Sequence, residues 1–592
     1  MTPAEYLERC RLVLITSAIV KTYHIRESFA DERKGYIRVI AGLLNGDFLE
    51  LAEYFVIDAG GILIQDHHYQ WMDEKRKTLR RRWDNTPHFP SLHGFPHHIH
   101  VENDANVMSG EPMSLEKLLA QIASLIDTQK SSSTEGPVFH LPDSEILSLS
   151  KEHVFYTWSA QAKVNPIAVK RAKGVYFWDV NDKRYLDFNS MTMCVNIGHG
   201  DERVIRAMQE QAAELPYAAP GMTTKIRALA SQAVADVTPG GKLSKILFTL
   251  GGADANENAI KLARGYTTRR GLRQRFKILT RYRSYHGATM GAMAATGDPR
   301  RHAWEPGTMP GVVHFLDPYR YRSTFHRTNP DISEEEFTQD YLNHLEEIIR
   351  YEGPESVAAI LMESVTGTNG IIIPPEGYMQ GVRALCDKYG ILMIADEVMS
   401  GFGRTGKWFA VDHWNVVPDI ITMAKGLTSA YAPLGAVAMK PEIAAAFDEQ
   451  VFESGLTYTS HPISLAAAVA NIRVMREDRL VERAAALGPV LKRMLSDLGE
   501  AHPSVGDVRS IGLFGILELV KDRKTKEPMA PWNGSSPEMV SLRKFCLDHG
   551  LFLYTHWHTV LIIPPLIIDE AQLGEGIAVL DRALEITDKA VL

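Results

Sequence analysis

Three segments of the chain carry residues that could do chemistry, and each directly follows a run of apolar residues. The first, Gly251–Asn256 (GGADAN), follows KILFT and opens an alanine-rich helical pattern. Small residues let a backbone approach an anion, and the free N–H groups of a helix N-terminus favour negative charge. By itself this segment is equally well an ordinary turn between a strand and a helix.

The other two segments place charged side chains after apolar runs. Asp396 and Glu397 end the most apolar run of the chain, and Lys425 follows IITMA between two small residues. A buried carboxylate is costly unless a cation compensates it. A desolvated amine is a good nucleophile for imine formation. Taken singly, the acids are more often structural ion pairs, and the lysine is more often an exposed residue just past a strand.

Together the three segments supply the parts that pyridoxal phosphate (PLP) requires. An anion site holds the phosphate, a carboxylate keeps the pyridine nitrogen protonated, and an amine forms the imine. Tyr285 and His286 follow another apolar run, and the tyrosine ring could stack on the pyridine. The combination predicts a PLP enzyme in which a strand-end lysine, Lys425, forms the imine and the acidic pair Asp396-Glu397 supplies the carboxylate.

The elements that must position these residues are short apolar strands alternating with helices. Continuously apolar runs are typical of strands buried on both faces of a parallel sheet, and ligands bind at the carboxyl ends of such strands. Repeated βα units predict an open α/β sheet, and helical patterns such as Ala255–Thr267 and Tyr378–Tyr389 lie between the runs. The expected strands are Lys245–Thr249, Phe276–Thr280, Gly311–Leu316, Val357–Glu363, Ile391–Val398, Ile420–Ala424 and Gly435–Met439.

A chain of 592 residues is too long for one core. The serine-rich stretch QKSSSTEG predicts a linker over residues 129–150, which separates an N-terminal α+β domain (1–128) from the strand–helix region. The net charge of −8 argues against a general nucleic-acid binder. Four scattered cysteines argue against a disulfide framework or a zinc site and favour a reducing cytoplasm, and no apolar run is long enough to span a membrane.

Residues from about 151 to 592 resemble a class III (ω-amino acid type) aminotransferase of PLP fold type I. The stretches that carry the resemblance are FTLGGADANENAIKLAR, RYRSYHGAT, IADEVMSGFGRTGKWFA, MAKGLTSAYAPLGAVAM and GLTYTSHP, in the family's order and spacing. The resemblance implies a large, mostly parallel, seven-stranded PLP-binding domain over residues 201–475. It also implies a smaller α+β domain built from residues 151–200 and 476–592.

The resemblance further implies roles for individual residues and a homodimer with shared active sites. It implies that the catalytic residues are Lys425, the Schiff-base lysine, and Asp396, the partner of the pyridine nitrogen. It also implies that Thr457 reaches the phosphate held by the neighbouring subunit. The remaining residues that it assigns to the cofactor are Gly252 and Ala253 (phosphate), Tyr285 and Val398 (the two ring faces), His286 (beside the ring) and Glu363 (a nearby acid).

The chain departs from the family pattern at places that bind ligands. Gly251-Gly252-Ala253 stands where the family usually has Ser-Gly-Ser, so a phosphate-binding hydroxyl is missing. Thr366 stands where many members carry glutamine. In the C-terminal region, Tyr554 lies near the place where many members have an arginine for the substrate carboxylate. That carboxylate clamp is therefore in doubt.

The substrates follow less directly than the cofactor. The motifs are most similar to the taurine:2-oxoglutarate aminotransferase branch, with a ping-pong Schiff-base mechanism. Arg283 could pair with a sulfonate or carboxylate, and Trp158 could wall the site. We expect an ω-amino donor, either taurine or a β- or γ-amino acid, and a 2-oxo acid acceptor, either 2-oxoglutarate or pyruvate. Other amines or amino acids are the alternative donors.

A rival interpretation comes from Gly401–Gly406 (GFGRTG), which satisfies the G-x-G-x-x-G pattern of nicotinamide-dependent oxidoreductases. That fingerprint requires the glycines to open a helix and an acid about 20 residues beyond them. Here an aromatic, β-branched stretch ending in a proline follows, and the acidic pair precedes the glycines. We therefore reject the dinucleotide site.

The N-terminal domain resembles a TumE-type toxin family, on the pattern D-N-x-P-H…F-P-H-H-x-H. Its histidines could bind a metal or a phosphodiester, and the basic run Lys75–Arg82 could bind nucleic acid. The histidines concerned are His88, His97, His98 and His100. Such clusters often cap a small sheet, so we favour a regulatory or oligomerisation domain and assign no metal site.

Overall fold

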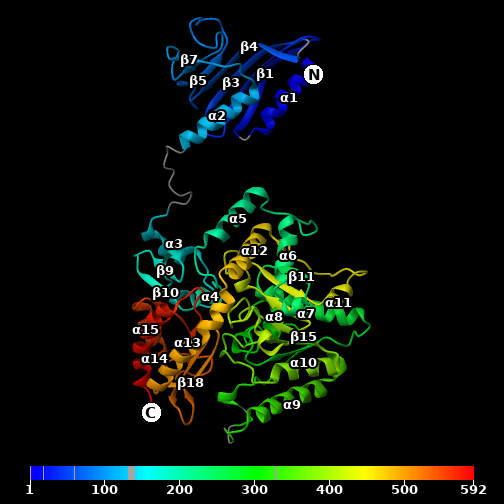
Figure 1. Cartoon of the computed structure of the whole chain (residues 1–592), viewed down its shortest axis with the longest axis vertical. Helices are drawn as coiled ribbons and strands as arrows, with labels where there is room; N and C mark the ends of the chain where they lie inside the picture. The colour runs from blue at the N-terminus through cyan, green and yellow to red at the C-terminus, as the bar shows by residue number, and fades with distance from the viewer. Residues whose placement is uncertain are drawn as a thin grey trace. The chain divides into compact units, whose positions relative to one another are not determined.

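The computed structural model describes residues 2–592 except 18, 59–60, 131–140, 324, 327–328 and 330. It divides into two compact units, Met1–Ser148 and Leu149–Leu592 (Figure 1). The middle of the linker predicted over residues 129–150 lies outside the described residues. No helix in the described ranges is long and apolar enough to cross a membrane.

The N-terminal unit is an antiparallel sheet in which the strands follow one another in sequence order. Along Lys34–Leu43 buried and accessible residues alternate, so one face of the sheet is buried. Helices α1 (Pro3–Thr16) and α2 (Leu115–Lys130) cover that face and share its apolar core. The strands are β1 (Val20–Ala30), β2 (Lys34–Leu43), β3 (Phe48–Asp58), β4 (Gly61–Met72), β5 (Leu79–Asp84), β6 (His98–Val101) and β7 (Val107–Ser109).

The larger unit is built on a seven-stranded sheet with the order β11-β17-β16-β15-β14-β12-β13. Strand β17 is antiparallel to both neighbours, and the other adjacent pairs are parallel. This confirms the α/β class and the mostly parallel sheet. The strands are β11 (Lys245–Thr249), β12 (Lys277–Arg281), β13 (Val312–Phe315), β14 (Val357–Glu363), β15 (Leu392–Asp396), β16 (Ile420–Met423) and β17 (Gly435–Met439).

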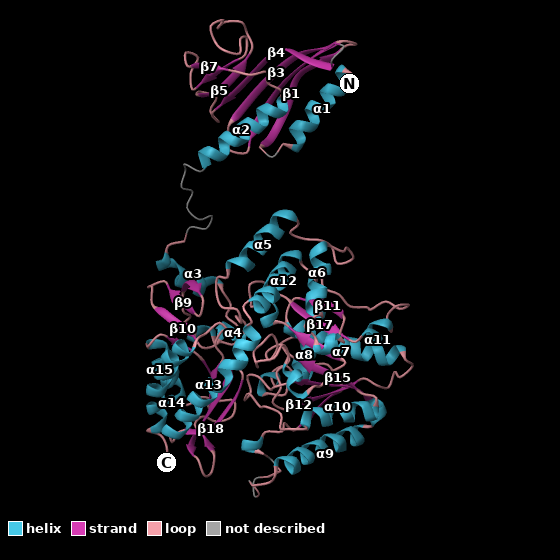
Figure 2. Ribbon diagram, in the orientation of Figure 1, coloured by secondary structure: helices cyan, strands magenta, loops and turns pink. Residues whose placement is uncertain are grey.

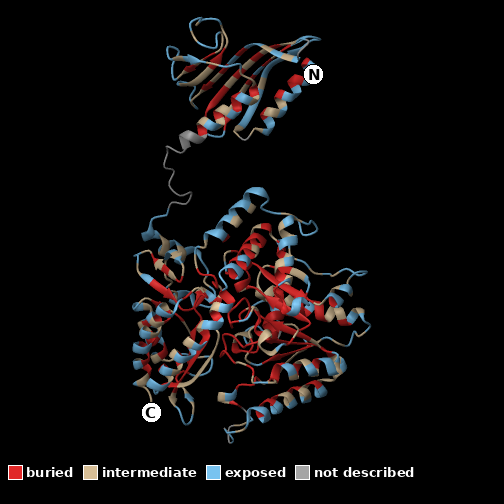
Figure 3. Ribbon diagram, in the orientation of Figure 1, coloured by how far each residue is buried: buried red, intermediate tan, exposed pale blue. Residues whose placement is uncertain are grey.

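Helices cover both faces of this sheet, as Figure 2 shows, and the strands between them are buried (Figure 3). The two helices expected from sequence periodicity correspond to α7 and α10. The helices are α5 (Glu202–Glu214), α6 (Lys225–Ala235), α7 (Gly252–Arg269), α8 (Met290–Ala295), α9 (Glu334–Glu352), α10 (Tyr378–Tyr389), α11 (Pro441–Ala445) and α12 (Pro462–Glu477).

The remaining elements combine both ends of this unit. Strand β10 pairs in parallel with β21, which joins residues far apart in the sequence. This pairing supports the proposal that 151–200 and 476–592 form one small domain. Its elements are β8 (Val169–Lys173), β9 (Tyr176–Asp179), β10 (Arg184–Asp187), α4 (Ser190–Met193), α13 (Leu480–Ala501), β18 (Val505–Ile511), β19 (Phe514–Asp522), β20 (Glu527–Pro528), α14 (Pro537–Asp548), β21 (Leu551–Phe552), β22 (Tyr554–His556), β23 (Thr559–Ile562) and α15 (Glu570–Asp588), and the short α3 (Ile146–His153) precedes them.

Candidate active site

A cavity of about 250 Å³ lies at the carboxyl ends of the central strands. Its walls come from the start of α7 and from the segments that end or follow β12, β14, β15 and β16. Parallel strands present their carboxyl ends at one edge, so segments distant in sequence meet there. The lining residues are Gly252, Ala253, Asn256, Tyr285, His286, Gly287, Ala288, Glu363, Thr368, Asp396, Val398, Met399, Ala424 and Lys425.

Asp396 ends β15, is 2% exposed and is held from several sides. Its Oδ2 lies 2.7 Å from Nδ1 of His286 and accepts a hydrogen bond of 2.8 Å from Nδ2 of Asn256. Its Oδ1 accepts a bond of 2.9 Å from the backbone N–H of Val398. The Oδ1 atom of Asn256 accepts a 2.7 Å bond from Thr422 on β16, which fixes the amide in turn. The carboxylate therefore has one defined orientation at the cavity wall.

Two further buried acids flank Asp396, and only one of them faces the cavity. Burial raises the pKa of Glu363 to about 7, and the neighbouring Asp396 charge adds to the shift. The carboxylate of Glu363 accepts bonds from the backbone N–H groups of Tyr285 and Gly367. Burial also raises the pKa of Glu397 to about 7. Glu397 accepts bonds from the segment 400–411, so it closes a loop and takes no part in lining the cavity.

Lys425 follows β16 and lines the cavity with a backbone φ of +35°. Residues other than glycine rarely adopt positive φ, and such strain of about 1–3 kcal/mol clusters at functional sites. The small neighbours Ala424 and Gly426 leave room for the bend. A Cβ added at Gly426 would lie 2.5 Å from the side chain of Asn196.

The cavity fits PLP at both of its ends. A Cβ at Gly252 would lie 2.8 Å from Cγ1 of Val398, so the missing side chain keeps space open beside the valine. No side chain caps α7 at Gly251, and the N–H groups of its first turn are available to an anion. Gly252 and Ala253 would hold the phosphate, Asp396 would face the pyridine nitrogen, and Lys425 would bind the aldehyde carbon.

Comparison with known proteins decides the family. The family model "Aminotransferase class-III" matches residues 157–584. The chain is a class III aminotransferase. The cofactor of this family is PLP, and PLP fold type I is confirmed by the solved relatives. A second family model, "Toxin TumE", matches residues 8–130 of this aminotransferase, as the sequence resemblance indicated.

Relatives of known name cover the catalytic unit almost completely. A putrescine–pyruvate aminotransferase of Pseudomonas aeruginosa is 34% identical, over 75% of this chain and 97% of its own length. A taurine–pyruvate aminotransferase of Bilophila wadsworthia is 33% identical, over 74% and 97%. The crystal structure of a taurine:2-oxoglutarate aminotransferase from Bifidobacterium kashiwanohense, in complex with PLP and glutamate, has a TM-score of 0.73 and 42% identity. The match covers 77% of this chain and 100% of the solved chain.

The structure brings together most of the residues proposed from the sequence. Those that line the cavity are Gly252, Ala253, Tyr285, His286, Glu363, Asp396, Val398 and Lys425. Trp158 packs edge-on against Tyr285, with ring centroids 6.3 Å apart, but does not line the cavity. Thr457 is exposed in the single chain, and its carbonyl oxygen accepts a bond from Tyr217.

Arg283 does not line the cavity either. Its guanidinium carbon lies 4.8 Å from the Tyr319 ring centroid and 4.6 Å from that of Trp532. The side chain thus packs against two aromatic rings. Arg404 of the GFGRTG segment is fully buried and donates to the carbonyl oxygens of Leu513 and Pro564. Arg404 therefore links its own segment to two segments near the C-terminus. Within the described residues, no α-helix directly follows the glycines at 401–406, which agrees with the rejection of a dinucleotide site.

Sequence reasoning missed Arg300, which lies at the edge of the site in the short 3-10 helix Pro299–Arg301. Its guanidinium carbon lies 3.9 Å from the Tyr285 ring centroid and 5.8 Å from that of Trp158. Its Nη2 donates a 3.2 Å bond to the cavity-lining Thr368. The buried Asp298 holds the guanidinium through Nε at 2.7 Å. The segment Gly297–Arg301 carries no periodicity that would have pointed to this cation.

Sequence reasoning also missed Asn256, which fixes Asp396. It lies one helical turn beyond Gly252 on α7, so the same helix supplies the phosphate end and the support for the carboxylate. That spacing is a signal the sequence does contain, because positions four residues apart share a helix face.

Proposed function

We propose that this aminotransferase moves an amino group from an acidic ω-amino donor, such as taurine or β-alanine, to a 2-oxo acid. The observation that carries the proposal is Arg300 at the rim of the cavity, stacked on the ring of Tyr285. Its hydrogen bonds within the described part of the chain use Nε and Nη2, so Nη1 remains for a ligand. A sulfonate or carboxylate accepts such charge-assisted bonds well.

Arg300 replaces two other candidates for the residue that binds the acid group of the donor. Arg283, proposed from the sequence, packs between Tyr319 and Trp532. The arginine expected in the C-terminal region is replaced by Tyr554, which stacks near His556. Burial, and next the positive charge of Arg300, lower the pKa of His556 to about 3, so this imidazole is neutral at physiological pH. We therefore assign the acid group of the donor to Arg300.

The names of the relatives agree with an acidic donor without deciding it. Two of them act on taurine by name and one on putrescine, which has no acid group. The names of these relatives give two acceptors, pyruvate and 2-oxoglutarate. We propose 2-oxoglutarate, whose distal carboxylate could use Arg300 in the second half-reaction.

The residues of the cavity have separate tasks in the proposed ping-pong reaction. Bound PLP would supply an electron sink for the charge that develops on the donor carbon. Lys425 would take the proton from that carbon as general base and deliver it to C4′ of the cofactor as general acid. Asp396, fixed by His286 and Asn256, would hold the ring nitrogen protonated. Tyr285 and Val398 would confine the ring between them, and Trp158 and Arg300 would orient the donor's acid group.

We further propose a homodimer with shared active sites, in a cytoplasmic enzyme. Thr457 supports the dimer. Its sequence context matches the family's phosphate-binding threonine, yet it is exposed in the single chain. A neighbouring subunit would bring it to the phosphate. Analytical ultracentrifugation of the PLP-bound chain tests this, and a monomer with full activity would contradict it.

A donor panel tests the substrate class. Taurine, β-alanine, 4-aminobutyrate and putrescine are each compared against 2-oxoglutarate and pyruvate. We expect at least one acidic donor to exceed putrescine in kcat/KM by tenfold or more. Lys425→Ala should lose transfer from every donor, because the same amine holds the cofactor and moves the proton. Putrescine as the preferred donor would contradict the acidic-donor proposal and leave the aminotransferase assignment intact.

A further inference from the structure

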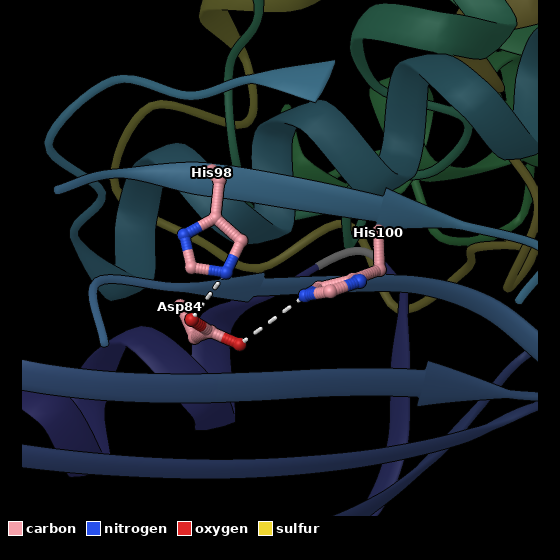
Figure 4. Close-up of side chains that lie close together, drawn as sticks. All are labelled: Asp84, His98 and His100. Carbon is pink, nitrogen blue, oxygen red and sulfur yellow. Dashed lines mark ion pairs between the residues drawn. The ribbon is translucent and has the colours of Figure 1, made fainter. Parts of the chain in front are cut away.

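Three buried side chains of the N-terminal domain converge on one point, as Figure 4 shows. Asp84 ends β5, and His98 and His100 lie on β6, which pairs with it so that Asp84 is opposite His98. Alternation along the strands places all three on one face, opposite the face on which Trp83 packs into the helix-covered core. They are 5%, 2% and 3% exposed respectively.

The hydrogen bond at Nδ1 of each imidazole identifies its tautomer. Nδ1 of His98 lies 3.0 Å from the carbonyl oxygen of Pro96, and Nδ1 of His100 lies 2.9 Å from that of Asp104. A carbonyl oxygen only accepts hydrogen bonds, so each Nδ1 carries the hydrogen. In a neutral imidazole the other nitrogen, Nε2, then bears a lone pair.

Both of those lone pairs are aimed at a carboxylate. Nε2 of His98 lies 2.8 Å from Oδ1 of Asp84, and Nε2 of His100 lies 3.8 Å from Oδ2. Neither nitrogen has hydrogen-bond geometry to any described group, in spite of the short His98 distance. A shared cation would satisfy all three groups.

We propose that Asp84, His98 and His100 bind one divalent transition-metal ion, of the kind represented by Zn²⁺. The candidate ligand atoms all lie within 4.8 Å of one another. Tetrahedral ligands at about 2.0–2.2 Å from zinc are separated by about 3.4 Å, so small side-chain shifts suffice. Imidazole nitrogen and carboxylate oxygen suit such metals. A hydrogen bond from the outer nitrogen to a backbone carbonyl is the usual support of a metal-binding histidine.

Among the residues that the structure describes, these three form the group of acidic and imidazole side chains close enough to share an ion. Of the four histidines that the sequence singled out, His97 stacks on His67 toward the helix-covered side, and His88 is exposed on the loop 85–97. The Phe89 ring of the same loop covers His98 and His100, at centroid distances of 4.9 and 5.8 Å. Three protein ligands leave a coordination position for water or another ligand, as in catalytic zinc sites.

One charge opposes the cation. Nε of Arg82 lies 3.2 Å from Oδ2 of Asp84 and repels a metal bound there. The same guanidinium also bonds Asp104 through Nη1 at 2.6 Å, so two carboxylates share its charge. A carboxylate offers about four lone-pair sites. Asp84 accepts one bond from Nε of Arg82 at Oδ2 and one from the backbone N–H of Thr86 at Oδ1, which leaves lone pairs on both oxygens for a metal. We therefore expect a site of moderate affinity.

The experiment uses the full chain, saturated with PLP and treated with a chelator before dialysis. Zinc per chain is measured by plasma mass spectrometry, and affinity by calorimetry. We expect one zinc per chain, and at least a tenfold loss of affinity in His98→Gln and in His100→Gln. His24→Gln, at an exposed histidine of β1, is the matched control and should bind like the parent. Aminotransferase activity, which uses the other unit, should be unchanged in all three variants.

Two results would overturn the site. One is a parent chain that binds no more zinc than the His98→Gln/His100→Gln double variant, which would make the cluster a structural ion pair only. The other is an X-ray absorption spectrum of the zinc-loaded parent in which the zinc lacks two imidazole nitrogens among its ligands. This measurement also decides the question if the variants fail to fold. Neither outcome bears on the proposed transaminase reaction.

Discussion

Arg300→Met is the substitution that most directly tests how the enzyme selects its donor. Methionine keeps an apolar stem over the ring of Tyr285 and removes the charge. A charge-assisted hydrogen bond contributes about 1.5–3 kcal/mol. The Arg300 side chain is 18% exposed and already shared with Asp298, so the lower half of that range applies. At about 1.4 kcal/mol per factor of ten, kcat/KM for taurine should fall tenfold to fiftyfold.

The assay is the ratio of kcat/KM for taurine to that for putrescine, because a ratio is independent of how much variant is folded. Putrescine carries no acid group, so its kcat/KM should change by less than about threefold. Arg301→Met is the matched control, since Arg301 bonds the carbonyl of Gly297 in the same turn. Arg300→Lys keeps a charge beside the buried Asp298 and should recover part of the ratio. Equal losses for both donors, or the same effect from Arg283→Met, would refute the role of Arg300.

Three further predictions concern the cofactor end of the cavity. Gly252→Ala should weaken PLP binding to the apoenzyme at least tenfold in an absorbance titration, because the added Cβ would press on Val398, whereas Gly251→Ala meets only an atom at 3.5 Å and should bind normally. Asn256→Ala should lower kcat about tenfold for all donors alike, since Asp396 loses a buried hydrogen bond, and a changed donor ratio would contradict this. The raised pKa of Glu363 means that the folded apoenzyme binds a proton between pH 4.5 and about 7 that the unfolded chain has lost, so this residue lowers stability as pH rises through that window. Glu363→Gln should therefore gain thermal midpoint relative to the parent from pH 5 to pH 8, and parallel pH profiles would contradict the assignment.

Much of the candidate active site is predictable because its residues directly follow strands in the sequence. The carboxyl ends of parallel strands lie at one edge of the sheet, so the residues that end or follow these strands come together there. Lys425, Tyr285, Gly252 and the acidic pair at residues 396–397 needed no knowledge of packing beyond that rule. The structure places Lys425, Tyr285, Gly252 and Asp396 around one cavity. The same rule could not separate Asp396 from Glu397. Adjacent residues of an extended segment point to opposite sides, and only the structure shows that Glu397 is bonded to the loop 400–411 whereas Asp396 lines the cavity.

The sequence by itself determined the fold class and the cofactor and predicted the lysine that would bind it, because the strand pattern and the motifs that carry the family resemblance are enough for those. Only the tertiary structure decided which arginine lies at the cavity mouth. Arg283 is nearer to Tyr285 in sequence, yet it packs between Tyr319 and Trp532, whereas Arg300 returns over the tyrosine ring through the turn after α8. In the same way, only strand pairing brought Asp84 to His98 and His100. Side-chain direction outside regular elements depends on the neighbours that pack against it, and those neighbours come from distant parts of the chain.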